Sequence, residues 1–166
     1  MKAIVVYESL WGNTAAIARA IAEGIGPEAR ALSTAEATAA VTADADLIVA
    51  GAPLHAFRLS TEKIRDALAT KKDEKAPTPP DLSHPSMRSW LAALPKGKGK
   101  AAAFETRFKW SPGGAAGSIM RGLKRAGYSK ASRPQKFLVK GVYGPLKNGE
   151  VERARAWGRE LAKLVK

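Results

Sequence analysis

Five short runs of apolar residues recur along the chain, and each has the length of a β-strand. They occupy residues 4–7, 29–32, 46–51, 101–104 and 137–139. In most of them the apolar residues are consecutive rather than alternating with polar ones, which is typical of strands buried on both faces of a parallel sheet. The pattern predicts five strands, and the run at 29–32 is a short, weak strand near an edge.

Between these runs, apolar residues recur every three or four positions, as they do on amphipathic helices. This spacing predicts helices at 15–25, 60–70, 87–94 and 115–126, and a last helix that starts at Asn148 or Gly149. Strands that alternate with helices indicate a doubly wound α/β fold, a three-layer structure with helices on both faces of a parallel sheet. We expect residues 1–166 to form one domain, since this length suits a single core.

Apolar stripes on these helices predict which side chains face the core. The second helix should bury Ile64, Ala67 and Leu68, and Trp90 and Trp157 fall on the stripes of later helices. Both tryptophans are therefore predicted to be core residues rather than ligand contacts.

Two segments give weaker or different signals. Residues 34–40 are small and fit either a helix or a loop. Residues 71–86 are polar and include Pro77, Pro79, Pro80 and Pro85, a spacing that no regular element tolerates. We expect a surface excursion there, within a crossover connection.

The first strand leads without a spacer into the turn at residues 8–14, ESLWGNT, and then into the first helix. This order directs the first N–H groups of the helix, and the positive end of its dipole, at the carboxyl end of the strand. Ser9 and Thr14 add hydroxyl groups, Asn13 adds an amide, and Gly12 allows a close backbone approach. The turn therefore suits a phosphate group, although an ordinary strand–helix turn capped by Thr14 or Asn13 is the alternative.

The residues of this segment resemble a known signature. The pattern Val5-Val6-Tyr7-x-Ser9-x-x-Gly12-x-Thr14-x-x-x-Ala18-x-x-Ile21 is similar to the phosphate-loop signature of the flavodoxin family. The resemblance implies a flavodoxin-like strand order of 2-1-3-4-5 and bound FMN, with the phosphate on residues 9–14. The chain departs from the family pattern at Trp11, where the family usually has a second hydroxyl residue.

Two further loops match the family's flavin-contacting loops less strictly. The resemblance implies that the flavin ring lies between residues 52–57 and 106–110. Two alternatives remain open for these loops. His55 either faces the ring or caps a backbone carbonyl. Phe108 and Trp110 either supply one ring contact between them or both anchor their loop. The complete set of predicted FMN-binding residues is Ser9, Leu10, Trp11, Gly12, Asn13, Thr14, Ala52, Pro53, Leu54, His55, Phe57, Thr106, Arg107, Phe108 and Trp110.

Composition removes several kinds of chemistry. The chain has no cysteine, which excludes disulfides, thiol redox chemistry and iron–sulfur ligation. Its two histidines, His55 and His84, cannot form a transition-metal site alone, and we predict no metal. No apolar run reaches membrane-spanning length and Met1 leads directly into the first strand, so we expect a cytoplasmic protein without a signal peptide.

The net charge of +13 is concentrated in one part of the chain. Residues 1–95 hold 10 basic and 11 acidic side chains, whereas residues 96–147 hold 13 basic side chains and one acidic one, Glu105. Such a field attracts anions, so we expect an acidic redox partner or an anionic small molecule. Nucleic acid is a disfavoured alternative, because no recognition helix, aromatic nucleic-acid motif or zinc finger accompanies the charge.

These observations favour an FMN-binding redox protein whose flavin carries the electrons, either a carrier or an oxidoreductase, with no catalytic side chain. The alternatives are an FMN-dependent quinone reductase and a flavin-free basic module that binds nucleic acid or another polyanion. Electron-carrying flavodoxins are typically acidic, whereas the loop predicted to cover the ring carries Arg107 and Lys109. We therefore expect a less negative reduction potential than that of acidic flavodoxins.

Overall fold

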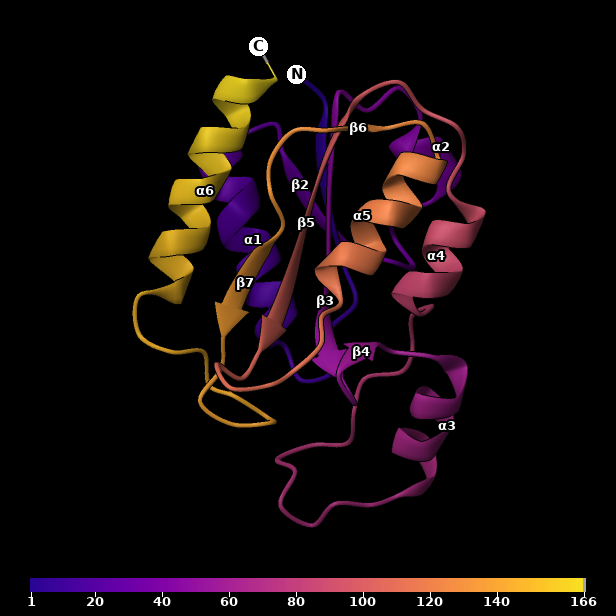
Figure 1. Cartoon of the computed structure of the whole chain (residues 1–166), viewed down its shortest axis with the longest axis vertical. Helices are drawn as coiled ribbons and strands as arrows, with labels where there is room; N and C mark the ends of the chain where they lie inside the picture. The colour runs from indigo at the N-terminus through magenta and orange to yellow at the C-terminus, as the bar shows by residue number, and fades with distance from the viewer. Residues whose placement is uncertain (166) are drawn as a thin grey trace.

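The computed structural model describes residues 1–165, and its strands and helices alternate as predicted (Figure 1). The strands are β1 (Ala3–Tyr7), β2 (Arg30–Ser33), β3 (Leu47–His55), β4 (Arg58–Leu59), β5 (Lys100–Arg107), β6 (Ser129–Lys130) and β7 (Gln135–Leu138). The helices are α1 (Asn13–Ile25), α2 (Ala39–Thr42), α3 (Glu62–Thr70), α4 (Met87–Ala93), α5 (Ala116–Arg125) and α6 (Glu150–Leu164).

The sheet has the predicted strand order. β1 lies between β2 and β3, and β3 pairs with β5, all in parallel. The last position is shared by β6 and β7, which pair in parallel with the beginning and the end of β5. Pro134 lies between these two short strands and cannot donate to a ladder, which explains why the fifth strand is split.

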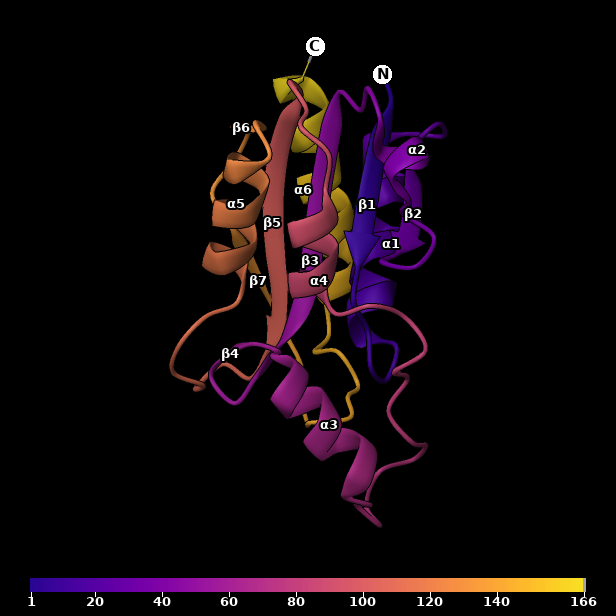
Figure 2. The same ribbon diagram turned by 90° about the vertical axis from the view of Figure 1, so that its right-hand side faces the viewer.

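Helices cover both faces of the sheet, and the two faces take alternate residues of the same strands (Figure 2). Val5 and Val49 pack with α1 and α6 on one face, whereas Val6 and Ile48 pack with α4 and α5 on the other. Both sets are buried, which confirms that these strands are covered on both sides.

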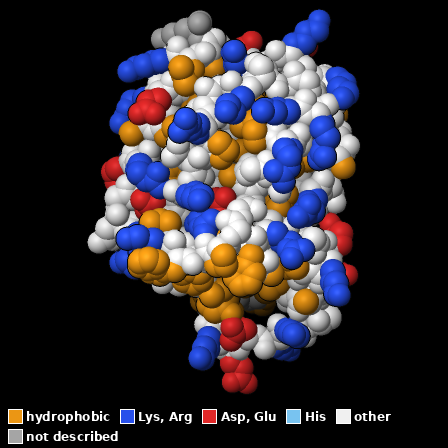
Figure 3. Space-filling view, in the orientation of Figure 1, with side chains coloured by type: hydrophobic (Ala, Val, Ile, Leu, Met, Phe, Trp, Pro, Cys, Tyr) orange, Lys and Arg blue, Asp and Glu red, His pale blue; other side chains and the backbone are white. Residues whose placement is uncertain are grey.

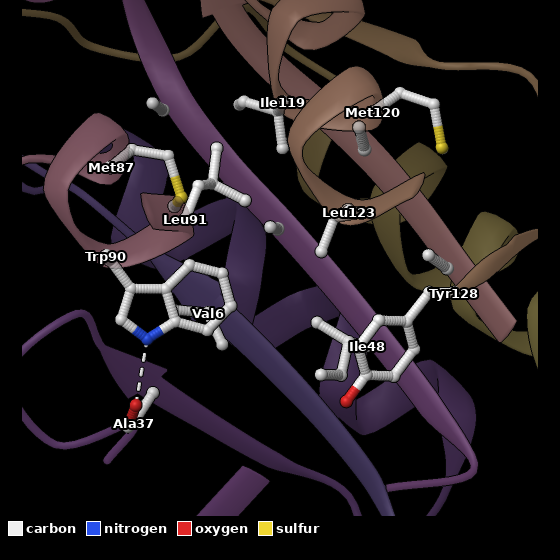
Figure 4. Close-up of a cluster of buried hydrophobic side chains, with 14 of the residues drawn as sticks. Val6, Ala37, Ile48, Met87, Trp90, Leu91, Ile119, Met120, Leu123 and Tyr128 are labelled. Carbon is white, nitrogen blue, oxygen red and sulfur yellow. Dashed lines mark hydrogen bonds between the residues drawn. The ribbon is translucent and has the colours of Figure 1, made fainter. Parts of the chain in front are cut away.

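Trp90 and Trp157 are core residues, as predicted. Figure 4 shows Trp90 with Met87 and Leu91 on the α4 side of the sheet, where its Nε1–H donates to the Ala37 carbonyl oxygen at 2.8 Å. Trp157 is buried on the opposite face beside Phe137, with ring centroids 6.1 Å apart.

The α1 and α6 helices approach each other closely at two glycines. A Cβ placed on Gly24 would overlap the Arg155 carbonyl oxygen, and one placed on Gly158 would overlap the Ile21 carbonyl oxygen. Only residues without a side chain permit this backbone contact. This contact holds α6 against α1, the helix that follows the turn at residues 8–14.

Between β4 and α4, the helix α3 differs from its prediction, whereas residues 71–86 agree with theirs. Residues 71–86 contain no regular element, as predicted, and α3 projects with them beyond the carboxyl end of the sheet (Figure 2). The predicted stripe of Ile64, Ala67 and Leu68 is not buried, and the buried residue of α3 is Arg65. The predicted stripe is wrong because α3 lies outside the two helical layers, and its buried contact with the rest of the protein is an ion pair.

Two predicted loops begin as strand. β3 continues to His55 and pairs with β4 through Leu54–Leu59 and His55–Arg58, so Ala52–His55 belong to a hairpin rather than to a loop. β5 likewise continues to Arg107, because β7 pairs with its last four residues. Both extensions carry chain from the centre of the sheet to its carboxyl edge.

Candidate functional site

A cavity of about 340 Å³ lies at the carboxyl edge of the sheet, where the three predicted loops meet. Gly12, Ala52 and Trp110 are the predicted residues that do not line it. Ala56, Ser111, Val139 and Val142 also line it and were not predicted. The predicted residues that do line it are Ser9, Leu10, Trp11, Asn13, Thr14, Pro53, Leu54, His55, Phe57, Thr106, Arg107 and Phe108.

The fourth wall, from the β7–α6 loop, could have been found only through topology. Val139 and Val142 carry no motif, but they follow a strand that ends at the same edge as β1, β3 and β5. In an open parallel sheet the carboxyl ends of the strands frame the ligand site.

The β1–α1 turn is held by its own serine. Ser9 Oγ accepts hydrogen bonds from Gly12 N at 3.1 Å and Ala15 N at 3.2 Å. The Ser9 amide donates to His84 Nε2 at 3.2 Å, and Thr14 Oγ1 lies 2.8 Å from Thr106 Oγ1. Neither Thr14 nor Asn13 caps α1, whose N-cap is Gly12 with φ +94°. These bonds fix the shape of the turn.

Four backbone N–H groups of this turn have no partner among residues 1–165: those of Leu10, Trp11, Asn13 and Thr14. Gly12 between them is exposed, with open space where a Cβ would stand. Successive N–H groups at a left-handed glycine and a helix N-terminus form a concave anion site. The turn therefore fits a phosphate through its backbone, without the second hydroxyl that Trp11 replaces.

The Trp11 side chain contacts three other segments of the chain. Its Nε1–H donates to the Thr78 carbonyl oxygen at 3.0 Å. Its ring lies 6.2 Å from that of His55 at 23°, and Tyr143 meets it edge-on at 4.7 Å. The Tyr143 hydroxyl in turn bonds the Asp73 carboxylate. Trp11 thus ties the β1–α1 turn to the 71–86 segment and to the β3–β4 hairpin.

His55 stands in the wall of the cavity with an unpartnered polar atom. Its Nδ1 is buried, and no hydrogen bond reaches that atom among the described residues. Burial lowers the pKa of His55 below its usual value of 6.5, so the imidazole is neutral at neutral pH. The expected alternative, a cap on a backbone carbonyl, receives no support at Nδ1.

Arg107 lines the cavity, but its charge is paired. Its Nη1 lies 3.1 Å from Glu105 Oε2 and donates to the Gly113 carbonyl oxygen at 2.9 Å. The other Glu105 oxygen accepts from the amides of Ala115 and Ala116, both at 3.2 Å, at the start of α5. Glu105 is the single acidic residue of the basic segment, so the expected positive field of Arg107 over the site is largely offset.

Phe108 and Trp110 differ in position. Phe108 lines the cavity, whereas the Trp110 side chain is 85% exposed and lies beside the Lys109 ammonium group, 5.2 Å from its ring centroid. Of the two rings, Phe108 is the one placed to meet a ligand in the cavity. The alternative, in which both rings anchor the loop to the body, does not describe Trp110.

A buried ion pair under the turn was not anticipated. Glu8 is fully buried; its Oε2 lies 2.5 Å from Arg65 Nη1, and its Oε1 accepts from Met87 N at 3.0 Å. Arg65 also donates to the His84 carbonyl oxygen at 2.5 Å. A glutamate directly after a buried strand was the only sequence signal. The network fastens α3 and the end of the 71–86 segment to the floor of the site.

The described residues contain no cluster of three metal-ligating side chains. Within the same part of the chain, no helix is both long and apolar enough to cross a membrane.

Comparisons with known proteins identify the fold. No protein-family model matches the chain, and no curated protein matches its sequence. Among solved structures, a flavodoxin from the domain Archaea is similar over 99% of both chains, with TM-score 0.69 and 22% identity. Flavodoxin 1 from Bacillus cereus is similar over 98% of both chains, with TM-score 0.62 and 19% identity.

A third similar structure is a flavodoxin, WrbA-like protein from Agrobacterium tumefaciens. It is similar over 99% of this chain and 96% of its own, with TM-score 0.60 and 19% identity. Together with the parallel strand order and the helices on both faces, these neighbours show that the chain has a flavodoxin-like fold.

Proposed function

We propose that this protein binds FMN at the carboxyl edge of the sheet and exchanges electrons through it. The observation that carries the proposal is the set of four unpartnered N–H groups at residues 10, 11, 13 and 14, beside a cavity walled by three further loops. The N–H groups suit a phosphate, and the cavity offers an adjoining space with apolar walls for a flat ring.

The residues divide the binding between them. The backbone of the β1–α1 turn would hold the phosphate, while Leu54, His55, Phe108 and Val139 would enclose the ring. Bound flavin supplies the electron-transfer chemistry, and the protein supplies binding, orientation and electrostatics. No side chain is assigned as a catalytic acid or base.

The surface around the cavity supports an acidic redox partner or an anionic small molecule. Phe57, Phe108, Trp110 and Val142 are exposed apolar side chains on three of the loops. Figure 3 shows apolar side chains gathered towards the lower end of the molecule, with Lys and Arg spread over the face above them. An apolar centre within a basic surround suits a partner with an acidic rim.

We also expect a reduction potential less negative than that of acidic flavodoxins. Since Glu105 offsets Arg107, this expectation now depends on exposed basic side chains such as Lys109. A potentiometric titration of the FMN-loaded protein that gave a strongly negative couple would contradict it.

Binding is tested by titrating the flavin-free protein with FMN and with riboflavin. Quenching of flavin fluorescence should give a tighter Kd for FMN than for riboflavin, because only FMN presents a phosphate to the turn. In a ¹⁵N-labelled sample, the amide signals of Leu10, Trp11, Asn13 and Thr14 should shift more with FMN than with riboflavin. Saturating FMN without quenching or shifts would refute the proposal.

The same sample separates the alternatives. If FMN binds, turnover of NAD(P)H with a quinone distinguishes a quinone reductase from an electron carrier. If no flavin binds, retention of the chain on an immobilised polyanion would favour the flavin-free basic module.

A further inference from the structure

We propose that this protein binds peripherally to an anionic membrane surface through three loops at the mouth of the cavity, here called the rim loops. They are the β3–β4 hairpin tip at residues 56–58, residues 108–114 between β5 and α5, and residues 139–149 between β7 and α6. The inference goes beyond the proposed function, because it concerns the surface on which these loops rest and does not require the cavity to hold a flavin.

The rim loops expose an unusual share of large apolar side chains. Among residues 1–165, six large apolar residues are exposed, and the two outside the rim loops, Met1 and Leu164, lie near the ends of the chain. Exposed apolar side chains scattered singly need no explanation, but a group of them at one edge of the molecule marks an interaction site. The four on the rim loops are Phe57 at 61% exposed, Phe108 at 36%, Trp110 at 85% and Val142 at 54%.

The aromatic side chains stand on a rigid base. Ala56 and Phe57 have φ +44° and +66°, a left-handed conformation that costs energy in residues with a side chain. Gly114 N donates to the Phe57 carbonyl oxygen at 3.3 Å, and a Cβ on Gly113 would overlap that oxygen. The hairpin tip and residues 108–114 are therefore packed backbone to backbone, beyond the carboxyl end of the sheet (Figure 2). The fold accepts a conformational cost to keep Phe57 at an exposed tip.

The charge of the rim loops has one sign. They hold four basic residues and no acidic one. Residues 71–75, which contact them through the bond between Asp73 and Tyr143, add three lysines against two acidic side chains. The surface around the exposed apolar side chains is therefore positive. The four basic residues of the rim loops are Arg58, Lys109, Lys140 and Lys147.

An anionic bilayer offers both environments that the rim loops require, negative headgroups and an apolar interior directly beneath them. Trp suits the boundary between the two, and the Lys109 ammonium group lies 5.2 Å from the Trp110 ring centroid, where it can meet a headgroup. Apolar insertion and attraction to anionic lipids then act together, as they do for other peripheral proteins, without a membrane-spanning helix.

A lipid surface accounts for the observations better than an acidic protein does. Phe57 and Trp110 stand at the tips of loops, which can enter a fluid layer without a matching pocket. The net charge of +13 is far larger than the four charges of the rim loops. An extended anionic surface attracts basic residues over a wide area, whereas one protein partner meets only those at its interface.

Sedimentation with lipid vesicles tests the proposal. The purified protein, with and without FMN, is mixed with vesicles of phosphatidylcholine alone or of phosphatidylcholine and phosphatidylglycerol in equal amounts. At about 0.1 M salt we expect binding to the mixed vesicles at least about tenfold tighter than to phosphatidylcholine, and weaker binding at about 0.5 M salt. Failure to bind the mixed vesicles would overturn the proposal.

Three variants test the apolar tips. Trp110→Ser removes one tip, and Phe57→Asn removes another while keeping a residue that tolerates a positive φ. Each should weaken binding to the mixed vesicles by about tenfold. Leu164→Ser is the matched control, since Leu164 is 53% exposed at the other end of the molecule, and it should leave binding unchanged. Unchanged binding in both tip variants would overturn the proposal.

Two pairs of lysines test the charge. The pair Lys109→Gln and Lys140→Gln should weaken binding to the mixed vesicles by about tenfold. The pair Lys96→Gln and Lys98→Gln removes the same charge at the opposite edge of the sheet and should weaken it by less than about twofold. Equal losses in the two pairs would show adsorption by net charge alone and would overturn the proposal.

Trp110 can report insertion directly. Trp90 and Trp157 are buried and Trp11 is half-buried, so Trp110 is the exposed indole among the described residues. Mixed vesicles with brominated acyl chains should quench part of the tryptophan emission of the wild type. Trp110→Phe should still bind these vesicles but lose that quenching. Wild type that binds without quenching would overturn the proposal.

Other results separate this inference from its alternatives. Retention on immobilised polyglutamate without binding to the mixed vesicles would overturn it in favour of an acidic protein partner. FMN binding without vesicle binding would overturn it and leave the proposed function intact. Quenching by the mixed vesicles in a protein that takes up no FMN would support it and refute the proposed function alone.

Discussion

Single buried side chains hold the loops of this site in place. Glu105, near the end of β5, pairs with Arg107 and also accepts hydrogen bonds from the two amides that begin α5. Both residues are buried, and together they close the loop that carries Phe108. The loop that forms this wall of the cavity therefore depends on the negative charge of Glu105, the single acidic residue of the basic segment 96–147.

Replacing Glu105 should be costly because it leaves a buried guanidinium without its counter-charge. We expect Glu105→Gln to lower the free energy of unfolding by about 3 kcal/mol, measured by urea denaturation. The double variant with Arg107→Met should lose less than Glu105→Gln alone. A double variant as unstable as the single one would show that the capping of α5, not the ion pair, carries the effect.

His55 should make stability depend on pH. Burial holds the pKa of His55 below 6.5 in the folded protein, so the unfolded chain binds a proton at higher pH than the folded one does. The contribution of the neutral form is complete above pH 6.5 and is lost as the pH falls through the lowered pKa. When the pH is lowered from about 7.5 to about 5.5, the Tm of the flavin-free wild type should therefore fall further than the Tm of His55→Phe. An equal fall in Tm for the two proteins would contradict this prediction.

Two features at the scale of elements set the geometry of the site. The helix α3 and the segment at 71–86 are anchored by Arg65 to Glu8 and to the His84 carbonyl group rather than by an apolar face. On the other side of the sheet, α6 rests directly on α1 through Gly24 and Gly158. One contact is ionic and the other is backbone to backbone.

Removal of the Arg65 charge should loosen the 71–86 segment. Arg65→Met leaves Glu8 buried and unpaired, and we expect a loss of about 3 kcal/mol in stability. Limited proteolysis should then cut residues 71–83 faster than in wild type. Lys63→Met, an exposed change on the same helix, is the matched control and should leave the cleavage rate unchanged.

The contact between α1 and α6 gives a second prediction. Gly158→Ala places a Cβ on the Ile21 carbonyl oxygen and should destabilise the protein by about 1–3 kcal/mol in urea denaturation. Gly117→Ala is the control, because the nearest atom to its Cβ would be 3.7 Å away on the exposed face of α5. It should stabilise the protein by up to about 1 kcal/mol, since alanine favours the helix.

The whole molecule carries its positive charge unevenly, and this bears on its partners. Exposed Lys109 and Lys140 lie on loops at the cavity, whereas Lys96 and Lys98 lie at the opposite edge of the sheet, before β5. A field of one sign at the mouth of a site raises the rate of encounter with anions, and salt screens it.

Anionic and cationic oxidants should therefore respond to salt in opposite ways. Oxidation of the reduced, FMN-loaded protein by ferricyanide should slow roughly tenfold between about 0.05 M and about 0.5 M salt in stopped flow. A cationic cobalt complex should not slow. The pair Lys109→Gln and Lys140→Gln should reduce the ferricyanide rate at low salt, and the pair Lys96→Gln and Lys98→Gln should not. Equal effects of the two pairs would show that only net charge matters.

The sequence by itself determined the positions of the five strands in the sheet and the convergence of three loops. The family resemblance added the strand order. Consecutive apolar runs such as Val5 and Val49 specify burial on both faces, and a glycine before a helix specifies a turn with free amides. These are local properties of the chain, and local patterns record them. Trp90 and Trp157 were assigned to the core for the same reason.

Only the tertiary structure decided which side chains are free to act. Whether Arg107 offers its charge depends on Glu105 and Gly113, and whether His55 Nδ1 has a partner depends on every segment around it. Arg65 on α3 pairs with Glu8 although 57 positions separate them, and the β7–α6 loop reaches the cavity only through the strand order. Pairing between distant residues leaves no periodic trace in a sequence, because it is set by how the layers pack.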